Sequence, residues 1–135
     1  RLCKTCKLVR PERSHHCSVC GHCVLRMDHH CPFTNCCVGL RNHGYFFLWL
    51  AGVWLGSGYG SAISFSSFSV CVWTGYLYGV EKLTPLELDK CIEMGKRSFI
   101  FLPALCIFLF MCILGGWHLL LIATNQTTIE FYRNR

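Results

Sequence analysis

The chain has 135 residues, of which 53% are hydrophobic and 15% are charged. That balance excludes an ordinary small soluble domain, and the length fits one domain or part of one. The formal net charge of +6 is unevenly distributed, because residues 1–43 hold seven Lys/Arg against two acidic residues. The same segment holds eight of the twelve cysteines and six of the seven histidines. We therefore expect a small cysteine-rich module joined to membrane segments.

The cysteines of residues 1–43 fit either disulfides or metal binding. Short cysteine-rich chains outside the cell are usually disulfide frameworks, whereas C-x-x-C pairs with interspersed histidines usually bind zinc. The clustered histidines favour zinc, since a disulfide framework has no use for imidazole. Gly, Pro, Cys and His interrupt every helical or strand period here. We predict little regular structure, a fold that depends on metal, and a reducing, cytosolic environment.

A 14-residue internal repeat assigns the metal ligands. Two sets, each of three cysteines and one histidine, have the offsets 0, 3, 13 and 20, and the second set begins 14 residues after the first. Such a set is a common tetrahedral site for structural zinc. The predicted sets are Cys3, Cys6, His16 and Cys23, and then Cys17, Cys20, His30 and Cys37. The sets interleave in sequence, so we expect two zinc sites that lock their loops together.

Cys31 would open a third repeat that cannot be completed. Its next positions are Thr34, Gly44 and Ala51, none of which completes a zinc site. We therefore predict that Cys31 is free of metal. Other unliganded groups of the segment include His15, His22, His29 and Cys36. Because closed structural zinc sites do no chemistry, these groups are the functional candidates.

The run Asp28-His29-His30-Cys31 is the candidate catalytic site. Nearby cations lower the pKa of a thiol, and a thiolate is a good nucleophile. His29 is placed to take the thiol proton, and Asp28 to orient His29. The alternative is that Cys31 is a spare ligand or a buried small hydrophobe. The sequence leaves open whether the three side chains meet.

Two apolar segments follow the cysteine-rich module. We predict a transmembrane helix with its flank at 44–80, a polar extracytosolic loop at 81–98, a second transmembrane helix at 99–123, and a cytosolic segment at 124–135. Each apolar stretch reaches the roughly 20 residues that a bilayer crossing needs. The side that holds both chain ends carries nine Lys/Arg near the membrane, against four in the loop, which places the module in the cytosol.

Two features inside the predicted spans allow two interpretations each. Gly52, Gly56 and Gly60 share one helical face, which indicates close helix packing or, alternatively, room for an acyl chain. An intramembrane histidine is a functional candidate by default. His118 lies near the end of its span, where a hydrogen bond to a neighbouring helix is the favoured interpretation.

The order of these residues resembles a known family. The pattern Cys3-x2-Cys6-x9-His16-Cys17-x2-Cys20-x2-Cys23-x4-Asp28-His29-His30-Cys31-x5-Cys37-x4-Asn42-x3-Phe46 resembles the cysteine-rich domain of the DHHC protein S-acyltransferases. Residues 127–130, Thr-Thr-Ile-Glu, are similar to the TTxE motif that follows the family's last span. The resemblance covers essentially the whole chain. The family usually has four or more spans, so we expect the chain to be a fragment of a larger protein.

The resemblance implies a membrane enzyme that transfers a fatty acyl group, usually palmitoyl, from acyl-CoA to protein cysteines by a ping-pong course. It implies that Cys31 carries the acyl group, that His29 acts as base and that Asp28 supports it. It places the zinc ligands on the eight residues of the repeat. Thr128 is implied to contact the catalytic Asp, and Asn42 to be structural. The implied partners are membrane-associated proteins with cytosolic cysteines, acyl-CoA and the bilayer, at the Golgi or endoplasmic reticulum.

Some residues depart from the family pattern or lack an assigned partner. Phe33 stands where the family usually has Trp, and Thr34-Asn35-Cys36 where a run with two Asn is commoner. Cys36 is then either a second acylation site or inert. The candidates for CoA phosphates or lipid headgroups are Lys7, Arg10, Arg13, Arg26 and Arg41, for each of which plain surface charge is the alternative.

Three rival functions follow from the same cysteines. The main one is a membrane-anchored zinc-binding interaction module, or an inactive family member, which would hold zinc but carry no thioester on Cys31. A thiol–disulfide enzyme would need a C-x-x-C pair free of metal, which the repeat with its histidines disfavours. Nucleic acid is not an expected partner, because membrane spans are present and a finger helix is not predicted.

Overall fold

The computed structural model describes residues 2–79 and 84–134. The chain divides into two compact units, one of Arg1–Trp49 with Gly115–Arg135 and one of Leu50–Leu114. The long helices α1 (His43–Tyr78) and α2 (Pro85–Ala123) contribute to both units. The short helix α3 (Thr128–Arg133) belongs to the first unit.

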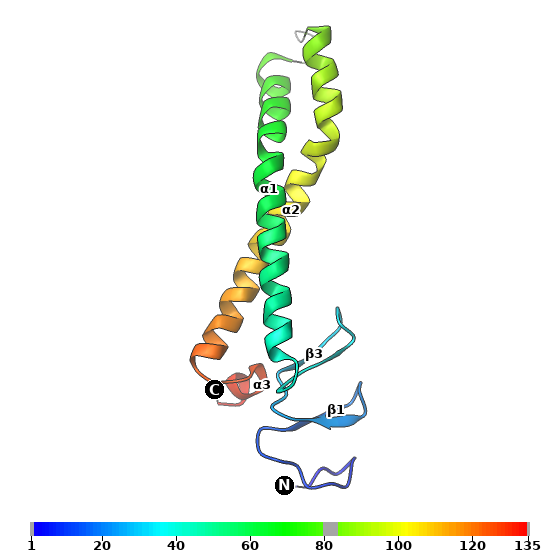
Figure 1. Ribbon diagram of the computed structural model, residues 1–135, viewed down its shortest axis with the longest axis vertical. Helices are drawn as coiled ribbons and strands as arrows, with labels where there is room; N and C mark the ends of the chain where they lie inside the picture. The colour runs from blue at the N-terminus through cyan, green and yellow to red at the C-terminus, as the bar shows by residue number, and fades with distance from the viewer. Residues whose placement is uncertain (1, 80–83, 135) are drawn as a thin grey trace. The chain divides into compact units, whose positions relative to one another are not determined.

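Two small β-hairpins form the cysteine-rich part of the first unit (Figure 1). Strand β1 (His15–Cys17) pairs antiparallel with β2 (His22–Val24), and β3 (His29–Cys31) pairs with β4 (Cys36–Val38). A shift of 14 residues carries one hairpin onto the other, since His16 faces Cys23 and His30 faces Cys37. The sequence repeat is therefore a structural repeat.

A left-handed residue marks the turn of each repeat. Lys7, Gly21 and Asn35 have φ angles of 55°, 72° and 49°, and they are spaced by 14 residues. Only the first two turns belong to the predicted zinc sets. The third turn follows Cys31, so the backbone conformation of the repeat occurs a third time although its second cysteine is replaced by Thr34.

The first two turns direct a backbone N–H at a cysteine sulfur. The N–H of Cys6 donates to Cys3 Sγ at 3.5 Å, and the N–H of Cys20 donates to Cys17 Sγ at 3.4 Å. The apolar core beside these turns is small. Its buried members are Cys17, Met27 and Cys37, with Cys20, Val24 and Ile129 packed against them. So small a core cannot supply much stability by burial alone.

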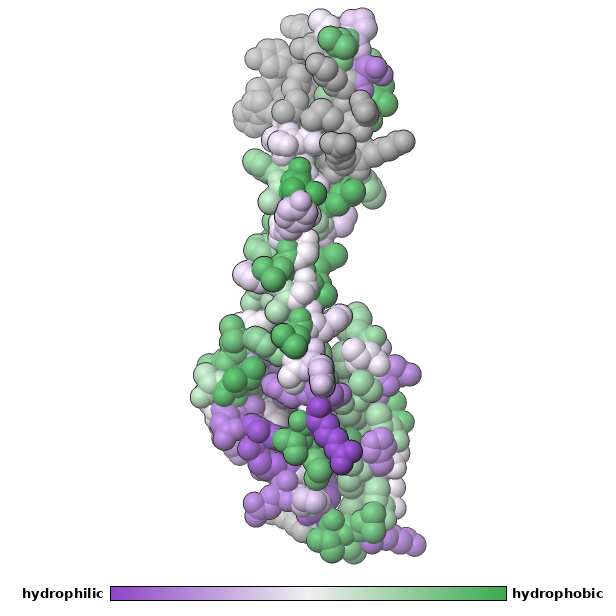
Figure 2. All heavy atoms as spheres, viewed as in Figure 1, coloured by the Kyte–Doolittle hydropathy of each residue, from purple (hydrophilic) through white to green (hydrophobic). Residues whose placement is uncertain are grey.

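The second unit consists of the facing parts of α1 and α2. The segments His43–Ser69 and Phe99–Ala123 are long and apolar enough to cross a membrane, and only 17% and 11% of their most apolar windows are buried. Figure 2 shows mainly apolar and near-neutral residues on the visible face of the middle part of the helices. Apolar side chains that are this exposed on long helices are typical of contact with lipid.

The glycines of α1 do not act as one packing stripe. Among the described residues, a Cβ on Gly52 or Gly56 would meet no atom within 4 Å, and one on Gly60 would meet Ala104 at 3.8 Å. The close contact is at Gly58, off the stripe, where a Cβ would lie 3.0 Å from the Phe108 ring. Gly56 and Gly60 instead line an apolar groove with Phe99, Pro103, Ala104 and their neighbours. The described residues therefore show no close helix packing at Gly52 and Gly56.

The predicted loop at 81–98 is wrong for most of its length. Helix α2 begins at Pro85, so residues 85–98 are helical, while residues 80–83 lie outside the described part. The prediction of a loop relied on charged residues, which exclude a segment from the bilayer core but not from a helix. Proline at the first helical position is favourable, and the Leu, Glu, Lys and Met residues that follow are good helix formers.

Gly39 is the glycine whose replacement we expect to be most harmful. A Cβ there would lie 2.8 Å from the Leu25 carbonyl oxygen and 2.8 Å from Val24 Cγ1. We predict that Gly39→Ala destabilises the first unit by about 1–3 kcal/mol, as overpacking does. Thermal unfolding and retained zinc in detergent micelles would measure the effect. The matched control is Gly44→Ala in α1, where a Cβ meets nothing within 4 Å. Equal behaviour of the two variants would contradict the prediction.

Candidate active site and metal centres

Eight cysteine and histidine side chains gather into two clusters. Within each cluster the donor atoms lie within 4.8 Å of one another. The clusters are Cys3, Cys6, His16 and Cys23, and Cys17, Cys20, His30 and Cys37. These are the two sets that the repeat predicts, and each has the donor chemistry of a tetrahedral structural zinc site.

The donor atoms approach one another as ligands of one ion would. His16 Nδ1 lies 3.2 Å from Cys6 Sγ, and His30 Nδ1 lies 3.3 Å from Cys20 Sγ. In the second cluster the sulfurs of Cys20 and Cys37 are 3.5 Å apart. The same Nδ1 atom of each histidine faces its cysteines. The residues present therefore fit zinc in both clusters.

The pleat of β3 separates the metal cluster from the candidate catalytic residues. Successive side chains of a strand point to opposite faces. His30 lies opposite Cys37, its partner in the second cluster, whereas His29 and Cys31 share the other face. One three-residue strand thus directs its histidine ligand to one side and both candidate catalytic side chains to the other.

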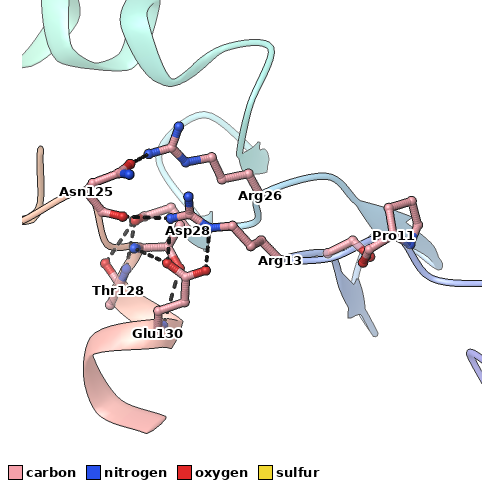
Figure 3. Close-up of polar contacts among 9 residues, drawn as sticks. Pro11, Arg13, Arg26, Asp28, Asn125, Thr128 and Glu130 are labelled. Carbon is pink, nitrogen blue, oxygen red and sulfur yellow. Dashed lines mark hydrogen bonds and ion pairs between the residues drawn. The ribbon is translucent and has the colours of Figure 1, made fainter. Parts of the chain in front are cut away.

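Asp28 is the most constrained member of the site. It is 1% exposed, and it accepts three hydrogen bonds. His29 Nδ1 lies 2.7 Å from Oδ2. The Thr128 hydroxyl donates to Oδ2 at 2.9 Å, and the Thr128 N–H donates to Oδ1 at 2.8 Å (Figure 3). Burial disfavours the carboxylate, but the hydrogen bonds from His29 and Thr128 outweigh it and lower the pKa of Asp28 to about 2.

His29 is held by Asp28 and by an aromatic wall. The Asp28 carboxylate fixes the proton on Nδ1, which leaves Nε2 as the nitrogen that can exchange a proton. The His29 ring meets the edge of Phe46, with centroids 5.2 Å apart. Hydrogen bonding to Asp28, opposed by burial and assisted by Cys31, raises the pKa of His29.

Cys31 is 3% exposed, yet its surroundings favour the thiolate. Burial raises the pKa of its thiol, but hydrogen bonds from the Thr34 side chain, from the N–H groups of Thr34 and Phe33, and from His29 lower it below the ordinary value. The N–H groups two and three residues ahead also stabilise the sulfurs of Cys3 and Cys17. The turn after Cys31 therefore has the same backbone N–H arrangement as the turns after Cys3 and Cys17, which are predicted zinc ligands. Cys31 itself lies outside both metal clusters of the described chain.

His118 completes the surroundings of His29. It is 3% exposed, and its ring lies 5.9 Å from His29, 5.1 Å from Phe46 and 6.2 Å from His43. One of its nitrogens lies within 4.8 Å of donor atoms of Asp28 and His29. Among the described residues (2–79 and 84–134), its Nδ1 has no hydrogen-bond partner. The favoured expectation, a hydrogen bond to a neighbouring helix, is therefore not met at Nδ1.

The segment after α2 is clamped onto the cysteine-rich module. Thr127 caps α3 in a capping box with Glu130. Arg13 donates to both carboxylate oxygens of Glu130, at 2.6 and 2.7 Å, and to the Asn125 carbonyl at 2.8 Å. Arg26 donates to the Asn125 side chain (Figure 3). The clamp brings Thr128 to Asp28, 100 residues away in the sequence.

The basic candidates for phosphate binding have different surroundings. The guanidinium groups of Arg13 and Arg26 already have partners, since Arg13 donates to Glu130 and Arg26 donates to Asn125. Arg10 lines an open cleft together with Arg133 and His15. Arg41 and Lys7 are exposed.

The two remaining predicted residues lie close to the second hairpin. Asn42 accepts the Gly39 N–H at 2.8 Å and donates to the Cys37 carbonyl at 2.9 Å, which ties the start of α1 to β4. Phe33 lies at the tip of the hairpin and is 82% exposed.

The sequence analysis missed the partnership of Arg13 with Glu130. The spacing Thr127-x-x-Glu130 is a capping-box signature that could have located α3, but nothing in the sequence pointed to Arg13.

Comparison with known proteins shows the family of the chain. The DHHC palmitoyltransferase family matches residues 1–135, so the chain belongs to that family, as the sequence analysis predicted. It is 40% identical over 133 residues to palmitoyltransferase ZDHHC15 of Xenopus laevis, covering 98% of this chain and 36% of the relative. It is 37% identical to palmitoyltransferase ZDHHC2 of Rattus norvegicus, over 99% of this chain and 33% of the relative. Palmitoyltransferase PFA3 of Debaryomyces hansenii is 36% identical, over 100% of this chain and 31% of its own length.

The chain therefore spans about a third of the length of these curated relatives. Its two apolar helices and its family membership indicate a membrane protein with sites capable of holding zinc.

We expect the ion pair of Arg13 with Glu130 to stabilise the clamp. The hydrogen bonds that Arg13 donates lower the pKa of the Glu130 carboxyl from 4.5 to about 2. The depressed pKa means that the contribution is complete above pH 4.5 and is lost only as the pH falls toward 2. At pH 7, Glu130→Gln should therefore cost about 1–3 kcal/mol of unfolding free energy.

A double-mutant cycle with Arg13→Gln, read by thermal unfolding at pH 7 in detergent micelles, isolates the pair. Glu12→Gln is the matched control, because Glu12 is exposed. A Glu130→Gln variant as stable as Glu12→Gln, or additive single effects in the cycle, would show that the pair contributes nothing.

Proposed function

We propose that this chain is the acyl-transferring part of a protein S-acyltransferase, which moves a fatty acyl group, typically palmitoyl, from acyl-CoA to cysteines of proteins. One observation supports this most strongly. Asp28, His29 and Cys31 form a connected acid, base and thiol, on the strand face that points away from the metal cluster. The names of the relatives, all palmitoyltransferases, agree with this chemistry.

In the first half of the reaction, Cys31 attacks the thioester carbonyl of acyl-CoA. His29 Nε2 takes the thiol proton and returns it to the departing CoA sulfur. Asp28 holds the His29 ring and stabilises its charged form. The backbone N–H groups of Phe33 and Thr34 lower the energy of the thiolate before the substrate arrives. The product is a Cys31 acyl-enzyme and free CoA.

In the second half, the thiol of a substrate protein attacks the acyl-enzyme. His29 then accepts the substrate's proton and returns it to Cys31. A thioester replaces a thioester in both halves, so the net free-energy change is small and no nucleotide needs to be hydrolysed. The protein has to supply position and proton transfer, which are the two effects that the site is built to give.

The two cysteine and histidine clusters would each hold a structural zinc ion. Each ion would have four protein ligands and no open position, so it would stabilise the fold without taking part in the reaction. Two zinc ions would compensate for the small apolar core of the first unit, since metal-binding free energy becomes folding free energy in such modules.

The membrane setting fits the two substrates. Acyl chains prefer the bilayer by about 0.8 kcal/mol per buried methylene, whereas CoA is anionic and soluble. We propose a cytosolic site in a multi-pass protein with four or more spans, of which this chain supplies two. Its partners would be membrane-associated proteins with cytosolic cysteines, at the Golgi or endoplasmic reticulum. Arg10 and Arg41 remain the candidates to meet CoA phosphates.

The test is acylation of Cys31. The membrane-reconstituted protein is incubated with an alkynyl palmitoyl-CoA, and hydroxylamine-sensitive label is measured on the wild type and on Cys31→Ser, with zinc content as the control for folding. We expect label on the wild type and its loss in Cys31→Ser, with about two zinc ions per chain in both.

Two outcomes would contradict the proposal. Label that persists in Cys31→Ser would place the acyl carrier at another residue. A wild type that holds zinc but takes no label would favour a membrane-anchored zinc-binding module or an inactive member of the family.

We also predict that His118 positions His29. Its ring lies against His29 and Phe46 in a buried position, so His118→Phe keeps an aromatic wall but removes the nitrogens. We expect the rate of acyl-enzyme formation to fall roughly 10- to 100-fold, with little change in KM for acyl-CoA. His118→Asn should restore part of the rate. A purely packing role would instead leave His118→Phe active and make His118→Asn the worse variant.

A further inference from the structure

Cys36 is a thiol that the proposed mechanism does not use. It belongs to neither metal cluster of the described chain, and it is half-buried. The register of the second hairpin places it directly opposite Cys31. Residues that face each other across an antiparallel pair have their Cβ atoms about 4.5–5.5 Å apart, on the same side of the sheet. Both thiols are therefore presented on the face that carries His29.

Thr34 connects the two thiols. The Cys36 thiol donates to the Thr34 hydroxyl oxygen at 3.4 Å. The Thr34 side chain also acts on the second thiol, because as a hydrogen-bond donor it lowers the pKa of Cys31. The Thr34 hydroxyl thus accepts a hydrogen bond from the Cys36 thiol and acts as a hydrogen-bond donor toward Cys31. This is the arrangement needed to move a proton from Cys36 to Cys31.

We propose that Cys36 is a second acyl site, which receives its acyl group from the Cys31 acyl-enzyme. This step rests on the proposed function, because it requires Cys31 to be loaded first. The Cys36 sulfur attacks the carbonyl carbon of the Cys31 thioester, a new C–S bond forms at Cys36, and the C–S bond to Cys31 breaks. The Cys36 proton passes to the Thr34 hydroxyl, whose own proton passes to the departing Cys31 sulfur. No other reactant is consumed.

The transfer displaces the acyl group very little. Only the carbonyl end changes its attachment, and it crosses one strand spacing within a single hairpin, so the hydrocarbon tail can stay in the bilayer throughout. A thioester is exchanged for a thioester, so the step is close to balanced in free energy. Cys31 regains its thiol and can be loaded again. The enzyme would then hold one acyl group on each cysteine.

The test follows acyl groups on the reconstituted protein after a rapid mix with palmitoyl-CoA. Fragment-ion mass spectrometry assigns hydroxylamine-sensitive acyl groups to each cysteine over time. We expect Cys31 to be loaded first and Cys36 later, with a burst of about two acyl groups per chain in the wild type and about one in Cys36→Ala. Cys31→Ser should carry no acyl group on Cys36.

Thr34→Val tests the proton path separately from loading. The acyl-enzyme is formed first and freed of acyl-CoA, and the migration from Cys31 to Cys36 is then timed. Without the hydroxyl we expect migration to slow roughly 100-fold, although valine keeps the shape of the side chain. Unchanged migration in Thr34→Val would overturn the relay.

The remaining outcomes separate this inference from the proposed function. Acylated Cys31 with an unmodified Cys36 would overturn the second site and leave the transferase intact. Acylated Cys36 in Cys31→Ser would overturn the transfer, because Cys36 would then react directly with acyl-CoA. A protein that holds zinc and takes no acyl group at either cysteine would overturn both.

Discussion

The structure of the first unit depends on one backbone turn that directs N–H groups at a cysteine sulfur. The turn follows Cys3, Cys17 and Cys31, and a left-handed residue marks it each time, at Lys7, Gly21 and Asn35. Hydrogen bonds to a thiolate favour its formation whether or not a metal is bound. In two copies the turn serves a set that can hold zinc. In the third, Thr34 replaces the second cysteine, and the same kind of turn lowers the pKa of Cys31, which lies outside both metal clusters of the described chain. A turn suited to metal binding therefore also suits a nucleophile.

The second constraint is the buried carboxylate of Asp28. A charge in so enclosed a position is costly unless hydrogen bonds compensate for it, and two of its three bonds come from Thr128. The end of α2 and the start of α3 must therefore be in place before His29 has a correctly held partner. The Arg13–Glu130 pair fixes that segment from the other side. The state of the candidate catalytic residues is thus coupled to a segment about 100 residues away in the sequence.

The sequence predicted the metal sets because their information is local. Cysteine and histidine residues at fixed offsets are nearly sufficient to predict a zinc site, and an internal repeat is visible without any knowledge of the fold. The apolar helices were equally accessible, since bilayer thickness sets their length. The start of α2 at Pro85 was missed because polarity was taken as a sign of a loop. The surroundings of Cys31 could not be predicted, because the roles of Thr34, His118 and Phe46 depend on turn geometry and on contacts between distant segments.

The pleat of β3 explains how so small a module separates its candidate metal ligands from its candidate catalytic side chains. His30 and Cys37 face the metal cluster, while His29 and Cys31 face the other way, although the two histidines are neighbours in the chain. Any ion bound by His30 would hold the strand rigid, and that rigidity fixes the separation of base and thiol. The arrangement also has a consequence for Cys36. Because the pleat alternates, the residue opposite Cys31 must lie on the face that carries His29 and Cys31. The register that brings His30 to Cys37 therefore also places Cys36 beside the proposed nucleophile.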